Sequence, residues 1–439
     1  MMEVLVIGAG VAGLAAAHTL AAEGVKVRIL EARNRIGGRI NTLQDPVLSI
    51  PIELGAEFIH GRPDELVTIS RAAGLATTEV SGPHVFYQHG KPAQRDELYP
   101  EVEEIFAQML DPSLPDQTFS EFLRAANAKL EAARWATAYV EGFNAARADR
   151  ISIHALAHEM RASDKIEGDR AFRFKDGYDR VTQWLWQDCA THSVALDLQT
   201  IVTSLKWRRG RAEAKGTALA GNARVTLPAD RVIVTVPLGV LKAPQEAPGA
   251  IRFDPELLAQ RAALERLEMG QAARVTLALK RAFWEEHPDL SDAGFIHSED
   301  EDFPTWWTSM QGQDTARGRA ITGWVGGPKA EKLTQLSDSE IAEHAIDSLA
   351  RILGANRETM GQRAERRYIH NWRNDPLARG AYSYARVGGQ EARRILATPV
   401  EDTLYFSGEA ANTDGHSATV HGAIASGQRA AHEILASLG

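Results

Sequence analysis

The most constraining feature of the chain is a glycine pattern within its first 13 residues. An apolar run, residues 4–7, leads directly into residues 8–13 (GAGVAG). The run is typical of a buried parallel strand, and the small residues after the glycines are typical of a helix. Gly8 permits the tight turn, Gly10 lets the backbone approach a pyrophosphate, and Gly13 lets helix and strand pack closely. The phosphates are expected at the helix N-terminus, where unpaired N–H groups favour negative charge.

A second strand and an acidic residue complete this pattern. Residues 25–30 (VKVRIL) are predicted as a strand that ends at Glu31. This carboxylate lies roughly 20 residues beyond the glycines, the offset expected of the acid that binds a ribose 2′-hydroxyl. A glycine pattern alone is a weak signal, but the strand, glycines, helix, second strand and acid in this order are specific. The alternative is an ordinary βαβ turn that binds no nucleotide.

Length and composition narrow the class of protein. A chain of 439 residues is too long for one simple core and predicts two intertwined domains. Its net charge of −9 disfavours a nucleic-acid partner. Cys189 is the only cysteine, which excludes an intramolecular disulfide and a cysteine-based metal site. No apolar stretch is long enough to span a bilayer, so we expect a soluble, cytoplasmic protein without a metal.

Helical and strand-like patterns alternate along the rest of the chain. Residues 64–170 are predicted to be mostly helical, and strands are expected within residues 201–207 and 223–237. A final strand, residues 404–406, leads into a glycine–acid turn and a helix from about residue 419. This turn directs a helix N-terminus inward and forms a second anion-binding element.

Capping residues locate two further helices. Residues 255–267 are predicted as a helix that Asp254 caps and that has proline at its first position. A second helix is expected over residues 337–353, because Ser337 and Glu340 have the spacing of a capping box.

Seven segments, spread over nearly the whole chain in the same order, resemble the flavin-containing amine oxidases. That family comprises monoamine oxidases, polyamine oxidases and the histone lysine demethylases that share their fold. The combination is specific for the family and less so for any one substrate. The resembling segments are residues 6–13, 31–39, 53–61, 235–241 (TVPLGVL), 274–284, 372–384 (WRNDPLARGAYSY) and 405–431.

The resemblance implies an α/β fold with a Rossmann-like, doubly wound FAD-binding domain and a second α+β substrate domain. The FAD-binding domain is expected to be discontinuous, and the substrate domain to occupy the segments between its parts. The expected FAD-binding segments are residues 1–75, 170–253 and 378–439, and the expected substrate-domain segments are residues 76–169 and 254–377.

The resemblance also implies FAD as cofactor and the residues that contact it. A helix beginning at Thr419 and Val420 would direct its positive end at the flavin N1/O2 edge and stabilise the anionic reduced ring. Monoamine oxidases attach their flavin to a cysteine, but Ala381 stands at that position here, so non-covalent FAD is expected. The expected FAD contacts are Gly8, Gly10, Ala12, Gly13, Glu31, Ala32, Arg33, Gly38, Arg39, Gly55, Ala56, Glu57, Val202, Gly408, Glu409, Thr419 and Val420.

Four further positions match residues around the flavin ring in the family. Tyr382 matches one wall of the aromatic cage, and Trp372 matches a tryptophan that stacks near the ring. The opposite wall, aromatic in monoamine oxidases, is Thr419 here, as in the demethylases, and this opens the pocket. His60 matches a pocket histidine of polyamine oxidases and could share a proton with the substrate near neutral pH. The alternative for the two aromatic residues and the histidine is packing in the core.

Arg274 is the main departure from the family pattern. The family has a lysine there, hydrogen-bonded through a water to flavin N5, and Phe283-Trp284 downstream sets the register. Arginine can donate to a water but cannot accept a proton. The chain therefore oxidises amines without the lysine, has an altered rate or oxygen reactivity, or has lost activity.

Taken together, these features predict oxidation of a primary or secondary amine to an imine, with O2 reduced to hydrogen peroxide. Polyamine-like or N-alkylated amines are the first choice of substrate, and an acidic run at residues 299–302 could form a cation-attracting rim. One alternative is an L-amino-acid oxidase in which Arg274 binds a carboxylate. Another is a flavin-binding protein without oxidase turnover. The sequence leaves the oligomeric state open.

Overall fold

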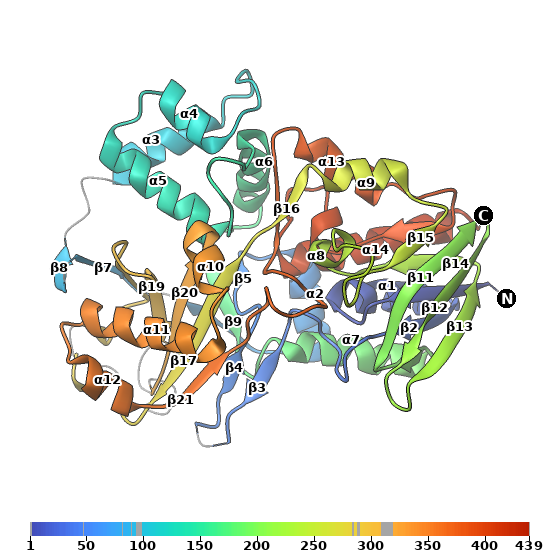
Figure 1. The fold of residues 1–439 in the computed structure, drawn as a ribbon, viewed down its shortest axis with the longest axis horizontal. Helices are drawn as coiled ribbons and strands as arrows, with labels where there is room; N and C mark the ends of the chain where they lie inside the picture. Colours follow the sequence, from blue (N-terminus) through green and yellow to red (C-terminus); the bar gives the residue numbers. More distant parts are fainter. Residues whose placement is uncertain are drawn as a thin grey trace.

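A five-stranded parallel sheet organises the lobe that carries both chain termini (Figure 1). The structure is a computed structural model that describes residues 2–438 except 47, 81, 89, 94–98, 283–284, 288–289 and 309–318. The strand order is β10-β2-β1-β14-β23, and every neighbouring pair is parallel. The strands are β1 (Glu3–Ile7), β2 (Lys26–Leu30), β10 (Ala195–Asp197), β14 (Arg231–Val234) and β23 (Leu404–Phe406).

Small residues let the first and last helices pack closely beside this sheet. Helix α1 (Val11–Ala22) contacts α14 (Val420–Ala436) along its length and α7 (Asp179–Thr191) on another side. A Cβ at Gly427 would lie 2.2 Å from the carbonyl oxygen of Ala12, so only glycine permits this approach. The predicted β1–α1–β2 unit and the C-terminal helix are confirmed, and the two helices lie side by side.

A four-stranded sheet, β13-β12-β11-β15, covers the other side of this lobe. The prediction of a helix over residues 255–267 was wrong at both ends. Asp254 is the last residue of a strand that pairs with β11, the helix begins only at Leu258 with Leu257 as its N-cap and ends at Leu264, and Leu267 begins the next strand. The elements are β11 (Thr200–Arg208), β12 (Arg211–Ala218), β13 (Ala223–Ala229), β15 (Arg252–Asp254) and α9 (Leu258–Leu264).

A seven-stranded mixed sheet forms the second lobe, in the order β21-β17-β20-β19-β18-β7-β8. Every residue of β17 is buried, because helices α10–α12 and the neighbouring strands cover it (Figure 1). Helix α11 begins with the predicted capping box of Ser337 and Glu340. The elements are β17 (Ala272–Leu279), β18 (Phe295–His297), β19 (Thr305–Thr308), β20 (Ala320–Gly326), β21 (Ala364–Ile369), α10 (Gly327–Leu333), α11 (Asp338–Ile352) and α12 (Arg357–Arg363).

Residues 64–170, which were predicted to be mostly helical, form strands as well as helices. Strands β7 and β8 join the sheet of the second lobe, where β7 pairs with β18, more than 200 residues later in the chain. Such non-local pairing leaves no short-range sequence signal. The elements are α2 (Asp64–Ala73), α3 (Tyr99–Met109), α4 (Phe119–Ala125), α5 (Leu130–Phe143), α6 (Ile153–Asp164), β5 (Ile59–His60), β6 (Thr77–Val80), β7 (His84–Gln88), β8 (Lys91–Ala93) and β9 (Ala171–Phe174).

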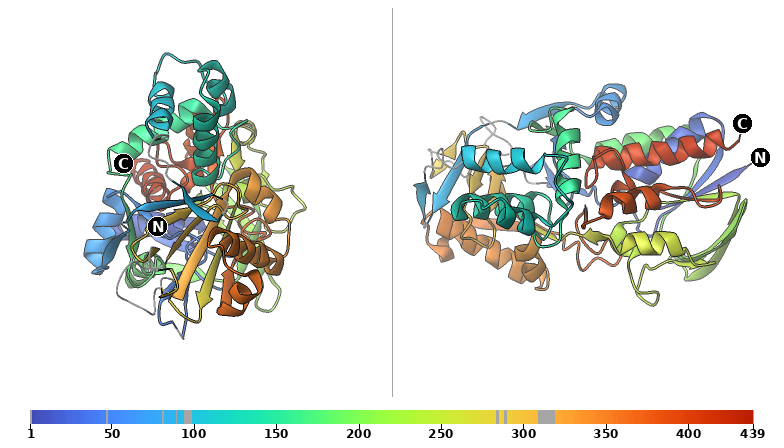
Figure 2. Two further views of the ribbon diagram at one scale, coloured as in Figure 1. Left: turned by 90° about the vertical axis from the view of Figure 1, so that its left-hand side faces the viewer. Right: turned by 90° about the horizontal axis from the view of Figure 1, so that it is seen from above.

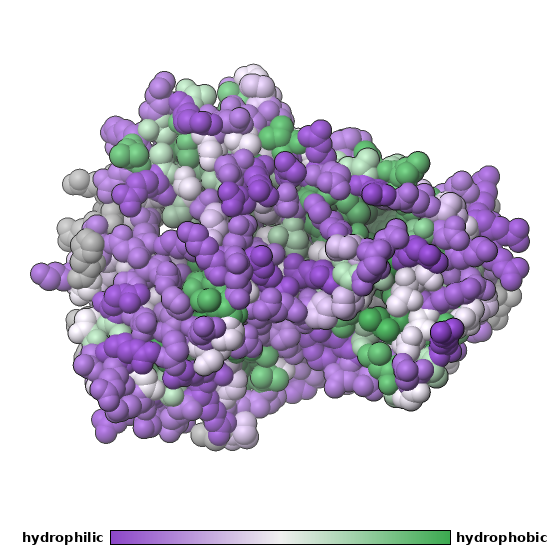
Figure 3. All heavy atoms as spheres, in the orientation of Figure 1, coloured by the Kyte–Doolittle hydropathy of each residue, from purple (hydrophilic) through white to green (hydrophobic). Residues whose placement is uncertain are grey.

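The two lobes lie end to end, with both termini at the outer end of the first lobe (Figure 2). Helices α3–α5 stand above the sheet of the second lobe, and helix α6 lies between the lobes (Figure 1). The surface seen in Figure 3 is mostly hydrophilic, with separate apolar patches. Within the described residues, no helix combines the length and apolar character needed to cross a bilayer.

Candidate active site

One large cavity connects the glycine turn of the first lobe with the sheet of the second. Its volume is about 1490 Å³, and every predicted site residue except Gly13 lines it. A Cβ at Gly13 would lie 2.0 Å from the carbonyl oxygen of Gly8, so this glycine is needed where α1 crosses the turn. The structure thus brings together residues that lie more than 400 positions apart in the sequence.

The nucleotide end of the cavity is built around Glu31, which is buried at the end of β2. Its carboxylate accepts hydrogen bonds from the backbone N–H groups of Ala9 and Arg33, each at 2.8 Å. Burial raises the pKa of Glu31, although these two hydrogen bonds oppose the shift. A Cβ at Gly10 would meet no atom within 4 Å, so the start of α1 is open toward the cavity. These residues fit the ribose and pyrophosphate of a dinucleotide.

The turn between β23 and α14, residues 407–419 and called the C-terminal turn below, forms the opposite end of the predicted FAD site. Arg39 donates to Glu409 and to the carbonyl oxygen of Ala381, both at 2.8 Å. Glu409 also accepts a hydrogen bond from the backbone of Ala418, and Thr419 caps α14 through the N–H of Gly422. Burial alone would raise the pKa of Glu409, but Arg39 and its other partners outweigh that effect and lower it.

Arg274 belongs to a buried ion cluster centred on Glu57. Its Nη2 lies 2.5 Å from Glu57 Oε2, and its Nη1 donates to the carbonyl oxygen of Gly55 at 3.3 Å. Arg173 Nε lies 2.7 Å from Glu57 Oε1, and the Trp307 indole N–H lies 3.2 Å from both carboxylate oxygens. The guanidinium of Arg274 is therefore held in place by protein groups.

The charges of this cluster depend on one another. Burial by itself would raise the pKa of Glu57, but Arg173 and Arg274 outweigh burial and hold it below its usual range. The neighbouring Glu53 has no such excess of cations, and burial raises its pKa to about 7. Sequence reasoning placed Glu57 among the FAD contacts and missed Arg173, because nothing in the local pattern of β9 signals a partner more than 100 residues away.

Aromatic and imidazole rings form the wall around Tyr382. Tyr382 stacks parallel to Trp324 at 6.5 Å between ring centroids, and its hydroxyl donates to the carbonyl oxygen of Phe143 at 2.7 Å. The His60 ring lies 5.4 Å from Phe143 and 6.2 Å from Phe58. Burial lowers the pKa of His60 to about 4, so this histidine is neutral at neutral pH. Trp324, Phe143 and Phe58 also belong to this wall, and their positions were not predicted from the sequence.

Trp372 lines the cavity and contacts the backbone of Leu54 and Gly55, next to the predicted FAD contacts. Its indole N–H donates to the carbonyl oxygen of Leu54 at 2.8 Å, and its ring lies 4.0 Å from that of His370. A Cβ at Gly55 would lie 3.2 Å from the Trp372 ring, so ring and backbone are in close contact. The downstream pair Phe283-Trp284, which set the register of Arg274, lies outside the described residues.

The acidic run at residues 299–302 is only partly directed at the cavity. Glu301 pairs with Arg351 and Asp302 with His344, each at 2.7 Å. Glu299 lines the cavity. In the described part of the chain, no group of three His, Cys, Asp or Glu side chains is arranged to hold a metal ion.

Comparison with known proteins identifies the family. The sequence model of the flavin containing amine oxidoreductases matches residues 11–435, and the chain belongs to this family. Polyamine oxidase 4 of Oryza sativa subsp. japonica is 29% identical over 98% of this chain and 88% of its own length. Lysine-specific histone demethylase 1 homolog 2 of the same plant is 27% identical over 99% of this chain and 57% of its own. A structure of wild-type putrescine oxidase bound to putrescine shares the fold, with a TM-score of 0.81, 22% identity and 99% of each chain covered.

Family membership establishes the cofactor and the reaction class. The protein is an FAD-dependent oxidoreductase that acts on amines, and the predicted family and fold class are confirmed. The FAD is held without a covalent bond, as expected from Ala381. Glu31 and the turn at residues 8–13 would hold the nucleotide half, and Arg39 with the start of α14 would lie toward the flavin half.

Proposed function

We propose that this enzyme oxidises polyamine-like or N-alkylated amines to imines, with O2 reduced to hydrogen peroxide. The observation that carries the proposal is the single cavity that joins the nucleotide turn to the ring-lined wall around Tyr382. When bound, FAD would supply the redox chemistry by accepting a hydride from the α-carbon; the amine nitrogen gives up a proton, and the two electrons and two protons together reduce O2 to hydrogen peroxide. The names of two relatives, a polyamine oxidase and a putrescine oxidase, support this substrate class.

The protein's own contribution is a shaped and largely apolar pocket. Amine oxidation needs a neutral amine held with its α-carbon against the cofactor. Tyr382 and Thr419 would form the two walls, and the Tyr382 hydroxyl is fixed by its bond to Phe143. Neutral His60 adds no cation that would repel a substrate ammonium.

The ion pair of Arg274 with Glu57 favours this function over an L-amino-acid oxidase. A substrate carboxylate at Arg274 would have to compete with Glu57, which already lies 2.5 Å away in a buried position.

We also propose that the enzyme's partners are small molecules, an amine and O2, because a net charge of −9 disfavours nucleic acid. We propose a cytoplasmic location, which the single, buried Cys189 supports, because thiols stay reduced there.

We propose the domain division predicted from the sequence, with one change. Helix α9 packs against α13 (Gly389–Ala397), and Leu257, Ala263 and Leu267 share a hydrophobic cluster with β11 and β14. Residues 254–269 are therefore better counted with the FAD-binding domain.

A peroxide-release assay tests the proposed function. The purified yellow protein is incubated with putrescine, spermidine, an N-methylated amine, benzylamine and L-amino acids. We expect peroxide from the first three amines and little from the amino acids. Turnover confined to amino acids would support the amino-acid oxidase instead. Flavin that no compound reduces under anaerobic conditions would indicate a binding protein without turnover.

Arg274→Lys is expected to speed the reaction of reduced flavin with O2 by about tenfold, equivalent to about 1.4 kcal/mol. A lysine ammonium is a compact charge that can also give up a proton, whereas the arginine charge is spread out and shared with Glu57. Stopped-flow measurement separates this half-reaction from amine binding, which should change little.

Arg173→Lys is the matched control, because Arg173 contacts the same Glu57 but is absent from the residues that line the cavity. Its reoxidation rate should stay near that of the unmodified protein. An Arg274→Lys variant with unchanged reoxidation and lost amine binding would place Arg274 in the substrate site.

A further inference from the structure

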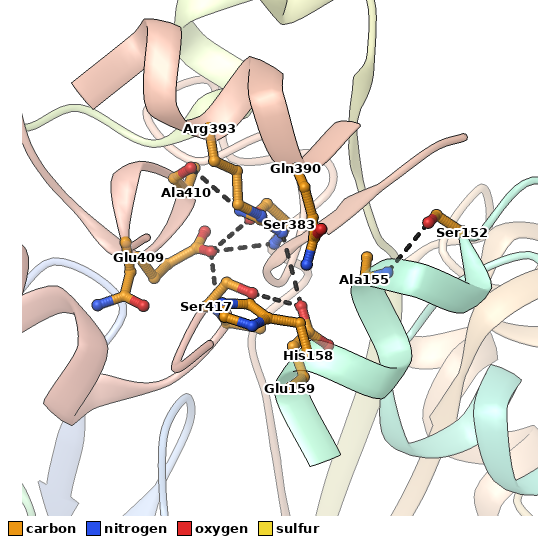
Figure 4. Close-up of polar contacts among 12 residues, drawn as sticks. Ser152, Ala155, His158, Glu159, Ser383, Gln390, Arg393, Glu409, Ala410 and Ser417 are labelled. Carbon is orange, nitrogen blue, oxygen red and sulfur yellow. Dashed lines mark hydrogen bonds and ion pairs between the residues drawn. The ribbon is translucent and has the colours of Figure 1, made fainter. Parts of the chain in front are cut away.

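A part-buried carboxylate that the proposed function does not use lies on the same cavity. Glu159, on helix α6, lines the cavity between the lobes. Figure 4 shows it beside Ser417 and below Arg393, in a network that also contains Ser383 and Glu409. Helix α6, helix α13 and the C-terminal turn all contribute to this network.

One oxygen of Glu159 is engaged and the other is open. Oε1 accepts a hydrogen bond from the Ser417 hydroxyl and lies 3.9 Å from Arg393 Nη2. Among the described residues, none forms a hydrogen bond with Oε2. The Glu159 side chain is 19% exposed, against 6% for Arg393, so the carboxylate is the open end of the network.

Arg393 lies 3.9 Å from Glu159 but directs its hydrogen bonds to other acceptors. Arg393 donates to the Ser383 hydroxyl and to the carbonyl oxygen of Ala410, and its charge is shared between Glu159 and Glu409. Burial raises the pKa of Glu159, Glu409 raises it further, and Arg393, Ser417 and His158 oppose the shift. An additional cation at Oε2 would stabilise the ionised carboxylate.

Three carboxylates that are more deeply buried on the cavity already have partners. Glu57 lies between Arg173 and Arg274, and Glu409 is bound by Arg39. Glu31 accepts two backbone hydrogen bonds at the nucleotide end. Glu159 therefore stands apart as a carboxylate with an open oxygen near the C-terminal turn.

We propose that Glu159 binds a second ammonium group of the substrate, one that is not oxidised, and so selects diamines and polyamines over monoamines. The inference rests on the proposed function, which places the reacting amine between Tyr382 and Thr419. Ser417, the hydrogen-bond partner of Glu159, precedes Thr419 by two residues, so the Cα atoms of Ser417 and Thr419 are at most about 7 Å apart. A chain of a few methylene groups would link an ammonium at Glu159 to the reacting amine beside Thr419.

Glu159→Gln tests the proposal, because glutamine keeps the shape and an acceptor for Ser417 but removes the charge. The substrates are putrescine and 1-butylamine, which have the same carbon chain and differ by one amine. We expect kcat/KM for putrescine to fall by about tenfold or more, mainly through KM, since a charge-assisted hydrogen bond is lost. The value for butylamine should change by less than about twofold, because its chain carries no second ammonium for Glu159 to bind.

A binding measurement makes the test independent of turnover. Quaternary ammonium ions have no lone pair to oxidise, so their binding can be followed through the flavin absorption spectrum. The unmodified holoenzyme should bind 1,4-bis(trimethylammonium)butane more tightly than butyltrimethylammonium, and Glu159→Gln should bind the two alike. If the unmodified protein oxidises no amine, the proposed function fails while this measurement still tests Glu159.

Two control variants separate binding from a structural role. Ser417→Ala removes the hydroxyl partner and leaves the carboxylate, so the preference for putrescine should persist. Glu141→Gln neutralises another cavity carboxylate, which accepts the N–H of Ala148, and should also keep the preference. Equal losses for putrescine and butylamine in Glu159→Gln, or an undiminished preference for putrescine, would overturn the proposal.

Discussion

Replacement of Glu57 by alanine is expected to lower the free energy of unfolding by about 3–5 kcal/mol. The change leaves Arg173 and Arg274 buried with no carboxylate between them, and breaking a buried pair from one side costs about this much. The Trp307 indole N–H loses its acceptor as well. Chemical denaturation of the holoprotein, followed by circular dichroism, measures the difference.

The stability difference should also depend on pH. The pKa of Glu57 is lowered from 4.5 in the folded protein, so its stabilising contribution is fully present above that pH. It is lost as the pH falls through the folded-state pKa and the carboxylate becomes protonated. The gap between the unmodified protein and Glu57→Ala should therefore be constant at neutral pH and narrow in acid.

Glu79→Ala provides the matched control for this prediction. Glu79 is also bound by an arginine, Arg170, at 2.7 Å, but this pair is largely exposed. Water and salt screen exposed pairs, which therefore contribute little to stability, so Glu79→Ala should unfold almost as the unmodified protein does. Equal effects of the two substitutions would mean that the Glu57 cluster contributes no more than a surface pair.

Glu31→Ala is expected to weaken FAD binding by about a hundredfold and to yield mostly colourless protein. Its carboxylate would accept hydrogen bonds from the ribose, and bonds to a charged group contribute about 1.5–3 kcal/mol each. The variant also loses the acceptor for the N–H groups of Ala9 and Arg33, which shapes the turn around the nucleotide. The ratio of flavin to protein absorbance after purification gives the occupancy.

Two further variants test whether a loss of FAD in Glu31→Ala is due to the missing carboxylate. Glu31→Gln keeps one acceptor oxygen but no charge, so an intermediate occupancy is expected. Glu23→Ala removes an exposed carboxylate just beyond α1 and should leave the flavin content unchanged. Full occupancy in Glu31→Ala would show that the ribose is held elsewhere.

The sequence by itself determined the parts of this protein whose signals are local. The turn at residues 8–13, strand β2 and the acid at its end lie within 31 residues, and each follows from backbone geometry or from the needs of a phosphate. The capping box of Ser337 and Glu340 and the start of α14 at Val420 were predicted for the same reason. Caps and glycine turns are settled by neighbours only a few residues away.

The tertiary structure alone decided which distant side chains meet. Arg274 of β17, Glu57 and Arg173 of β9 form one ion cluster, although more than 200 residues separate the first two. Tyr382 stacks on Trp324 of β20, and Glu159 of α6 contacts Ser417 of the C-terminal turn. These contacts depend on how strands pair across the two sheets and how helices pack between the lobes. Pairing of this kind is fixed by the burial of whole surfaces, which no short stretch of sequence encodes.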